Sequence, residues 1–271
     1  MTDLISRQQR RRIVREQIRS GERLADTGLA ATPTRAQMRD VARALHAKLT
    51  ETRNPRRASE AAQLAQTLMD TSLRRYPGTA AIACKKGCAY CCSSYVVVTA
   101  PEVFRIAELV RAGKASGASA ADVRVRAVAL RDLGPRERVG AKLACPLLVG
   151  TDCSVYSSRP LTCRQATSLS VAACIEEYEN TGDPDGRIQI SSAHLAHSGN
   201  ASVALLVAMV AAGLSTQPLE LSAALAAVLD DADAEERWLA GEAVFDSLPR
   251  RDVRAPHIDR VAQMIAADLG S

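Results

Sequence analysis

Residues 84–92 read CKKGCAYCC, and a second run from Cys145 to Cys174 holds the other four of the eight cysteines in the chain. Four thiols this close in sequence can converge on one metal without waiting for long-range folding. Thiolate sulfur is a preferred ligand of zinc and of iron–sulfur clusters. The two cysteine blocks therefore predict a metal-binding protein. The candidate metal ligands are Cys84, Cys88, Cys91, Cys92, Cys145, Cys153, Cys163 and Cys174.

Disulfides and scattered structural thiols are the alternative uses of these cysteines. A disulfide framework needs an oxidising compartment and is usually found in a small secreted chain. Residues 1–15 (MTDLISRQQRRRIVR) lack the apolar core of a signal peptide, and eight cysteines in 271 residues is a low density for a disulfide scaffold. We therefore expect a cytoplasmic protein with reduced thiols, where closely spaced cysteines more often mark metal or redox sites.

The composition favours a mainly α fold. Hydrophobic residues make up 47% of the chain and aromatic residues only 3%, while Ala, Leu and Val recur at helical intervals. The longest apolar stretch, Val203–Leu214, has twelve residues, too few for a membrane span, so we expect a buried helix there. The prediction is a helical protein with a central cysteine-rich metal-binding region made of loops and one or two short strands.

Capping residues, helical spacing and Pro or Gly breaks give the expected elements. Short strands are expected at Tyr95–Val98 and Pro146–Val149, and Trp238 and Phe245 are expected to anchor the core between C-terminal helices. The expected helices begin near Thr32–Pro33 and near Ser59, follow the caps Thr99 and Ser119, and cover Val171–Glu179, Ser192–Ala212, Leu219–Leu229 and Pro256–Leu269.

The positive charge is concentrated near the N-terminus. Residues 1–57 hold fourteen Lys and Arg against six Asp and Glu, a net +8, and the rest of the chain has twenty-one against twenty-four, a net −3. We predict a basic helical arm over residues 1–56. The remainder, 57–271, is predicted to be one cysteine-cluster domain with its metal-binding core at about 84–174 and C-terminal helices over 190–271. The arm is either a solvated helix or a contact surface for an acidic partner or nucleic acid.

Four ordered blocks, CKKGCAYCC, VVVTAPE, CPLL and CSVYSSRPLTCR, resemble the YkgJ-like cysteine-cluster family, whose members are described as zinc- or iron-chelating domains and often labelled iron–sulfur-cluster proteins. The resemblance covers about residues 84–174 and implies metal or cluster binding. Many members read Cys-x2-Cys-x2-Cys-Cys, whereas three residues separate Cys84 from Cys88 here. For most members the resemblance implies no established reaction, apart from relatives that resemble flagellin lysine methylases.

The spacing of the first block suits a tight loop around metal. Gly87 can adopt the positive φ that such a loop often requires. Adjacent Cys91 and Cys92 diverge in an extended segment, so both are ligands most easily if they serve two metal ions or if one bridges. Either a polynuclear site uses most of the eight thiols, or one four-coordinate centre takes half of them and the others pack nearby.

Several other residues are candidates for supporting roles. A centre of four thiolates with zinc, or with an oxidised four-iron cluster, has a net charge of −2, so nearby cations could stabilise it. The cations expected in this role are Lys85, Lys86, Arg159 and Arg164. His194 and His197 are three apart on one helix face, a spacing open to metal ligation or to an ordinary polar helix start. Glu102 is expected to cap a helix.

We expect an iron–sulfur cluster, favoured over zinc because the thiols outnumber any histidine partners and because of the family labels. A redox-active cluster would make the protein an electron carrier or oxidoreductase, and zinc would make it a scaffold for an adaptor or nucleic-acid-binding protein that uses the basic arm. Cys84, Cys88 and Cys91 with Tyr90 also resemble the radical S-adenosylmethionine motif. That alternative is disfavoured because the strands of a partial barrel are not expected downstream.

Overall fold

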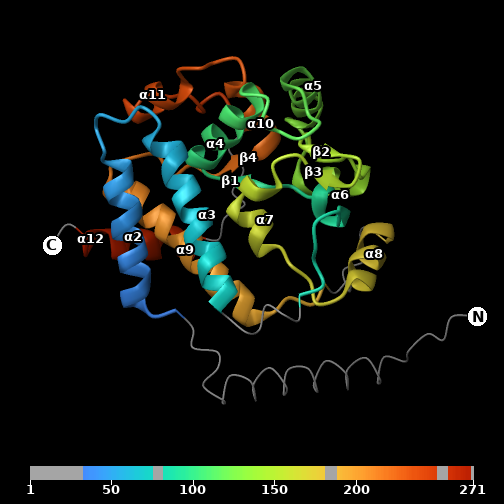
Figure 1. Cartoon of the computed structure of the whole chain (residues 1–271), viewed down its shortest axis with the longest axis horizontal. Coiled ribbons are helices and arrows are strands. Elements are labelled where there is room, and N and C mark those ends of the chain that lie inside the picture. The colour runs from blue at the N-terminus through green and yellow to red at the C-terminus, as the bar shows by residue number, and fades with distance from the viewer. Residues whose placement is uncertain (1–32, 76–81, 181–187, 249–255, 270–271) are drawn as a thin grey trace, which may run out of the picture.

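The computed structural model describes residues 33–75, 82–180, 188–248 and 256–269 (Figure 1). Within these residues the chain is mainly α, as predicted, and each strand has two residues. Two 3₁₀ turns, η2 (Tyr90–Ser93) and η3 (Tyr156–Ser158), lie in the cysteine region. Residues 1–32, most of the predicted basic arm, lie outside the described residues. The α-helices are α2 (Arg35–Leu49), α3 (Arg57–Arg75), α4 (Ala100–Arg111), α5 (Ala120–Leu130), α6 (Pro135–Ala141), α7 (Leu161–Gln165), α8 (Val171–Glu179), α9 (Ser192–Ala211), α10 (Leu221–Val228), α11 (Ala234–Leu239) and α12 (Pro256–Ala267).

Helix α9 is the centre of one side of the molecule, and α2, α3, α7 and α12 pack against it (Figure 1). Its buried alanines, among them Ala204 and Ala208, let neighbouring helices approach closely, and Leu205 and Met209 fill the space between them. The predicted buried helix over this segment is confirmed. Among the described helices, α9 is long and apolar enough to cross a membrane, but half of it is buried inside the protein and a packed core helix meets the same criteria.

Helix α2 begins two residues later than predicted. Thr34, rather than Thr32, is its N-cap: the Thr34 hydroxyl accepts a hydrogen bond from the Gln37 backbone N–H (3.2 Å), and the Gln37 side chain accepts one from the Thr34 N–H (2.8 Å). This reciprocal pair makes Thr34 the better cap. The apolar face of α2 is buried against α3 and α9, so residues 35–49 share the core of the rest of the molecule.

Two short antiparallel strand pairs brace the cysteine region. β1 (Val97–Val98) pairs with β4 (Leu219–Glu220), and β2 (Leu148–Val149) pairs with β3 (Asp152–Cys153). The predicted helix at Leu219–Leu229 was wrong at its start, because the first two residues pair with β1 before the helix begins. The Glu220 side chain then caps α10 by accepting a hydrogen bond from the Ala223 N–H (2.7 Å).

An aromatic cluster closes the core beneath α4. The ring of Phe104 lies 5.6 Å from that of Trp238 and 5.7 Å from that of Phe245, measured between centroids. All three side chains are buried, and their tilted geometry is favourable for aromatic pairs. The prediction that Trp238 and Phe245 are core anchors is confirmed.

A buried ion pair joins α6 to β4 and to the end of the first cysteine block. The side chains of Arg138 and Glu220 are 1% and 4% exposed, and Arg138 Nη1 lies 3.2 Å from Glu220 Oε1. Arg138 also donates to the Ser222 hydroxyl (2.9 Å) and to the carbonyl of Ser94 (3.4 Å). Because Ser94 directly follows η2, this guanidinium fixes the exit of the first cysteine block against β4.

Replacing Arg138 with Met should lower the free energy of unfolding by about 3–5 kcal/mol, because Glu220 would remain as an uncompensated buried charge. Denaturant titration followed by the fluorescence of Trp238, the one tryptophan of the chain, measures this. Arg131→Met is the matched control, since its ion pair with Asp132 is exposed and should contribute less than about 1 kcal/mol. Equal losses in the two variants would contradict the role given to Arg138.

Candidate metal centre

The first cysteine block is a tight turn followed by one 3₁₀ turn. The N–H of Cys88 donates to the carbonyl of Lys85 (3.1 Å), and Gly87 has φ of +86°, the left-handed conformation expected for it. Cys91 and Cys92 are the two middle residues of η2. The first block is therefore a compact segment of two consecutive turns, located in the chain between α3 and β1.

The second cysteine block folds back along the first. The N–H of Cys145 donates to the carbonyl of Cys92 (2.7 Å), and the N–H of Ala83 donates to the carbonyl of Ser168 (2.9 Å). These two backbone contacts join the blocks at both ends of the first one. The second block presents Cys145 just before β2, Cys153 in β3, Cys163 in α7 and Cys174 in α8. The structure thus brings together two cysteine runs that are more than fifty residues apart in the sequence.

Backbone N–H groups donate to three of the sulfur atoms. Ser168 donates to Cys84 Sγ (3.2 Å), Leu147 donates to Cys145 and Val155 donates to Cys153. The last two donors stand two residues after their cysteine, in turns that point the amide back at the sulfur. Such contacts favour the thiolate form, which is the form that binds metal.

Burial nevertheless keeps most of these thiols neutral when no cation is near. It raises the pKa of Cys145 to about 12, and it raises the pKa of Cys163 well above the ordinary value for a thiol. Burial also raises the pKa of Cys84 and of Cys153. A metal cation supplies the positive charge that makes a buried thiolate favourable, so these four side chains have the chemistry of a site completed by metal.

The side chains of Cys91 and Cys92 are in hydrogen-bond contact. The Cys92 thiol donates a hydrogen bond to the Cys91 sulfur, and this contact, with a further effect of nearby Arg159, lowers the pKa of Cys91 to about 6. The same contact raises the pKa of Cys92. All eight cysteines are free in the structure, and Cys91 is the exposed one.

Arg159 faces the thiols. Its guanidinium lies over the ring of Tyr156, 4.4 Å from the centroid, and its charge partly offsets the burial that raises the pKa of Cys153. The Nε atom of Arg159 is buried and has no hydrogen-bond partner among the described residues. An anionic thiolate centre beside it would supply the missing counter-charge, so this side chain fits the supporting role predicted for it.

Arg164 is engaged in holding the second block together. Its buried guanidinium donates to the carboxylate of Asp70 on α3, to the carbonyl of Ser157 (2.5 Å) and to the carbonyl of Arg159 (3.0 Å). Its contacts therefore position η3 and α7, the elements around Cys163. Lys85 and Lys86 are exposed on the first block, consistent with ordinary solvated cations.

Glu102 ties helix α4 to the element that carries Cys163. The fully buried carboxylate accepts hydrogen bonds from the N–H (2.8 Å) and hydroxyl (2.7 Å) of Thr99, which is the predicted capping contact. Its other oxygen accepts one from the N–H of Leu161 (2.7 Å), the first residue of α7. The sequence predicted the hydrogen bonds to Thr99, which are local. It did not predict the bond from Leu161, because Leu161 is far from Glu102 in the sequence and meets it only in the folded chain.

The histidines support the site from outside. His194 is buried, and its Nε2 lies 3.0 Å from the carbonyl of Arg164, while His197 Nδ1 lies 3.4 Å from the hydroxyl of Ser72. Each of these contacts engages one ring nitrogen of its histidine with another group of the protein. Cys174 stands on α8, which packs against η2 and brings Tyr178 to within 5.8 Å of Tyr90 between ring centroids.

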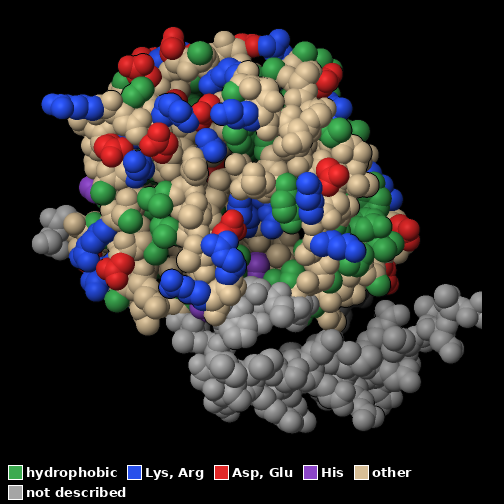
Figure 2. Space-filling model, in the orientation of Figure 1, with side chains coloured by type: hydrophobic (Ala, Val, Ile, Leu, Met, Phe, Trp, Pro, Cys, Tyr) green, Lys and Arg blue, Asp and Glu red, His purple; other side chains and the backbone are tan. Residues whose placement is uncertain are grey.

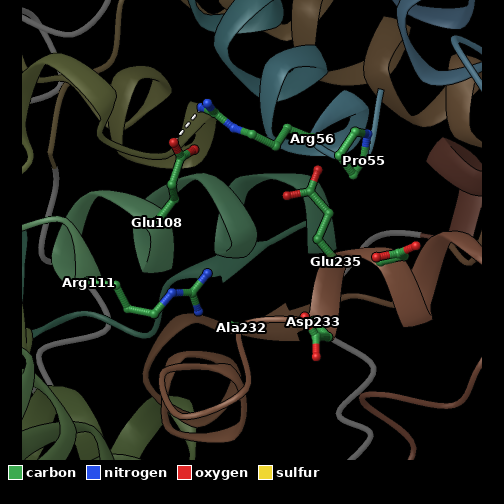
Figure 3. Close-up of a pocket in the computed structure, with 8 residues that line it drawn as sticks. Pro55, Arg56, Glu108, Arg111, Ala232, Asp233 and Glu235 are labelled. Atoms are coloured by element: carbon green, nitrogen blue, oxygen red, sulfur yellow. Dashed lines mark ion pairs between the residues drawn. The ribbon is translucent and has the colours of Figure 1, made fainter. Parts of the chain in front are cut away.

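A cavity of about 260 Å³ borders the cysteine region and includes Cys92 in its wall, with Tyr90, Tyr178 and Lys142 around it. A second cavity, about 330 Å³, lies away from the cysteines between α4 and α11 (Figure 3). There Arg56 and Glu108 form an ion pair across the opening, and Glu235 accepts a hydrogen bond from the Ser59 N–H (2.7 Å). Arg56, Glu108 and Glu235 on this cavity are thus engaged with other groups of the protein.

In the described part of the chain, no group of three or more Cys, His, Asp or Glu side chains has the convergent arrangement of a formed metal site. The cysteines would have to approach one another more closely than in this structure to bind one metal. The described strands form only two short antiparallel pairs, so the barrel that the radical S-adenosylmethionine alternative requires is not found among them.

Comparison with known proteins identifies the class of the cysteine region. Residues 83–184 match the family model CxxCxxCC, described as "Putative zinc- or iron-chelating domain", so this part of the chain is similar to that cysteine-cluster family. The match confirms the predicted resemblance and supports metal binding, with zinc and iron both named. No curated protein and no solved structure matches the chain.

Replacing Glu102 with Gln should destabilise the protein by about 1–3 kcal/mol, because one amide oxygen cannot accept from both Thr99 and Leu161. The amide nitrogen would instead face an N–H donor. Glu137→Gln is the matched control, an exposed capping-box carboxylate on α6 that accepts from the Gly134 N–H alone. Thermal unfolding of the two variants measures the difference, and equal midpoints would contradict the proposed bridge from α4 to α7.

Proposed function

We propose that the protein holds an iron–sulfur cluster, or alternatively zinc, through cysteines drawn from both blocks. The observation that carries the proposal is that the second block runs back along the first. Two backbone hydrogen bonds, from the Cys145 N–H to the Cys92 carbonyl and from the Ala83 N–H to the Ser168 carbonyl, join the blocks. This return places cysteines from both runs around one region. Metal chelation is also the property described for the matching family.

The candidate ligands are the eight cysteines named from the sequence. Their state supports the proposal, since all are free thiols and at least four have pKa values raised by burial. Metal binding would release the protons of these thiols and draw the two loops inward. The free energy of metal binding would then contribute directly to the stability of the folded region.

Iron–sulfur is the favoured cofactor. The ligand set is rich in thiols, and Nε2 of His194 is in hydrogen-bond contact with the carbonyl of Arg164. The amide donors to sulfur and the cation of Arg159 are the kinds of contact that tune the potential of a cluster. A cluster held this way would carry electrons or serve an oxidoreductase. Zinc in the same thiols would give a structural scaffold.

We further propose that the protein works in the cytoplasm. The eight unpaired thiols suit a reducing compartment, where disulfides rarely persist and thiolates remain available to metal.

Protein purified without oxygen should be brown, with an absorbance band at about 400 nm that is lost on exposure to oxygen and a chelator. Iron and acid-labile sulfide in similar molar amounts would support the cluster. The Cys163→Ser variant should lose this colour, and Ser154→Ala, which removes a buried hydroxyl without a partner among the described residues, should keep it.

Colourless protein with stoichiometric zinc would contradict the cluster and support the scaffold. Protein that takes up neither metal, and that unfolds at the same temperature with and without chelator, would contradict the proposed function as a whole.

A further inference from the structure

The cavity of about 260 Å³ beside the cysteine region is formed by three segments that are distant in the sequence. The first cysteine block contributes Tyr90 and Cys92, the segment from α6 to β3 contributes Lys142 and Leu148, and α8 contributes Tyr178. Tyr90 and Lys142 are exposed, so the cavity is open to solvent. Pockets for drug-sized ligands begin at about 300 Å³, so the occupant of this cavity would be a small molecule.

The wall of the cavity combines aromatic and aliphatic side chains with a single charged group. The rings of Tyr90 and Tyr178 meet edge to face, with 5.8 Å between their centroids and an angle of 66° between their planes. Leu148 and two alanines add aliphatic surface. Among the described residues of the wall, Lys142 is the only Lys, Arg, Asp or Glu. An anion with a planar apolar body therefore matches the wall, because it meets rings and a cation but no carboxylate there.

The backbone conformation of Lys142 is one that a side chain disfavours. Lys142 caps the C-terminal end of α6 with φ of +51°, and it is the non-glycine residue with positive φ in the described part of the chain. Glycine is the usual residue at such a left-handed position, because a Cβ atom there crowds the following carbonyl oxygen. The turn alone does not call for a lysine, so the long charged side chain is the feature that needs a reason.

The ammonium of Lys142 is in contact with uncharged groups. It lies over the ring of Tyr178, 4.9 Å from the centroid, and donates to the carbonyl of Glu179 (3.4 Å). No ion pair joins Lys142 to a carboxylate among the residues that the structure describes. An ammonium has three N–H donors, so two remain for a ligand. Because this cation already covers one face of Tyr178, a cationic ligand is disfavoured at that ring.

We propose that the cavity binds a small aromatic carboxylate, with its ring against Tyr90 and Tyr178 and its carboxylate on the Lys142 ammonium. Hydrogen bonds between two charged groups are stronger than neutral ones, and the ring contacts orient the ligand. The site is independent of the proposed metal-binding function, since none of these three side chains is a candidate metal ligand. Cys92 is in the same wall, so the bound carboxylate lies beside the candidate metal centre.

Calorimetric titration of the full chain, purified without oxygen, with benzoate as the probe tests the site. Benzoate should bind with a dissociation constant of about 1 mM or lower, as expected for a ligand of its size. Benzylammonium has a similar ring with the opposite charge, and acetate has the carboxylate without the ring. Each of these should bind at least about tenfold more weakly than benzoate, because each lacks one of the two contacts.

Variants assign the binding to the cavity. Lys142→Gln removes the charge with little change in length and should weaken benzoate binding by about tenfold or more. Tyr178→Leu removes a ring of the wall and should also weaken it. Lys114→Gln is the matched control, an exposed lysine outside this wall, and should bind benzoate like the wild-type chain. Lys142→Gly suits the left-handed backbone, so it should lose benzoate binding and unfold at a higher temperature than Lys142→Gln.

Three results would overturn the site: no benzoate binding by the wild-type chain, equal binding of benzoate and benzylammonium, or unchanged benzoate binding by Lys142→Gln. The metal content of each preparation separates this site from the proposed function. Lys142→Gln should keep the metal content of the wild-type chain, and loss of metal together with benzoate binding would also overturn the site. A wild-type chain that binds benzoate but no metal would overturn the proposed function and leave the site standing.

Discussion

The structure depends on the antiparallel return of the second cysteine block along the first. Thiols can share a metal only if their backbones are held a few ångströms apart, and two backbone hydrogen bonds, Cys145 to Cys92 and Ala83 to Ser168, provide this (2.7 and 2.9 Å). Two buried side chains, Arg138 and Glu102, hold the segments that flank these two contacts. The Arg138 guanidinium holds the exit of the first block at Ser94, and the Glu102 carboxylate holds the start of α7.

The two helices of the second cysteine block, α7 and α8, differ in how closely they pack against the rest of the protein. Helix α7 packs against α9 and α3, and α3 in turn packs against α4 and α9. Helix α8, by contrast, has no buried residues and touches the site through η2. Lys and Arg side chains are mixed with Asp and Glu over the described surface in view, without one charge dominating it (Figure 2).

The sequence predicted the features that depend on local chemistry. The caps at Thr99 and Ser119, the left-handed Gly87 and the bounds of α8 follow from short-range hydrogen bonding and sterics, and the structure has them as expected. The sequence did not predict α6 and α11, which are too short to show periodicity and are held by tertiary packing. It also did not predict that β4 would replace the first turn of a helix, since β4 exists only because β1 lies beside it.

The sequence predicted which residues belong to the candidate site, but it did not predict how they are arranged in space. The cysteines were evident from their spacing, but which of them pack against the hydrophobic core, as Cys145, Cys153 and Cys163 do, is a property of the fold as a whole. The same applies to Arg159 and Arg164, equivalent cations in the sequence. In the structure one faces the thiols while the other is bound to Asp70 and to backbone carbonyls.

X-ray absorption at the K-edge of the metal in natively purified protein tests the central claim most directly. Thiolates from both blocks should give a first shell made only of sulfur, at about 2.3 Å for zinc or iron. In the Cys163→Ser variant the average number of sulfur neighbours should fall. A first shell of oxygen and nitrogen in the wild-type protein, or a sulfur shell unaffected by the loss of Cys163, would contradict the gathering of the two blocks around metal.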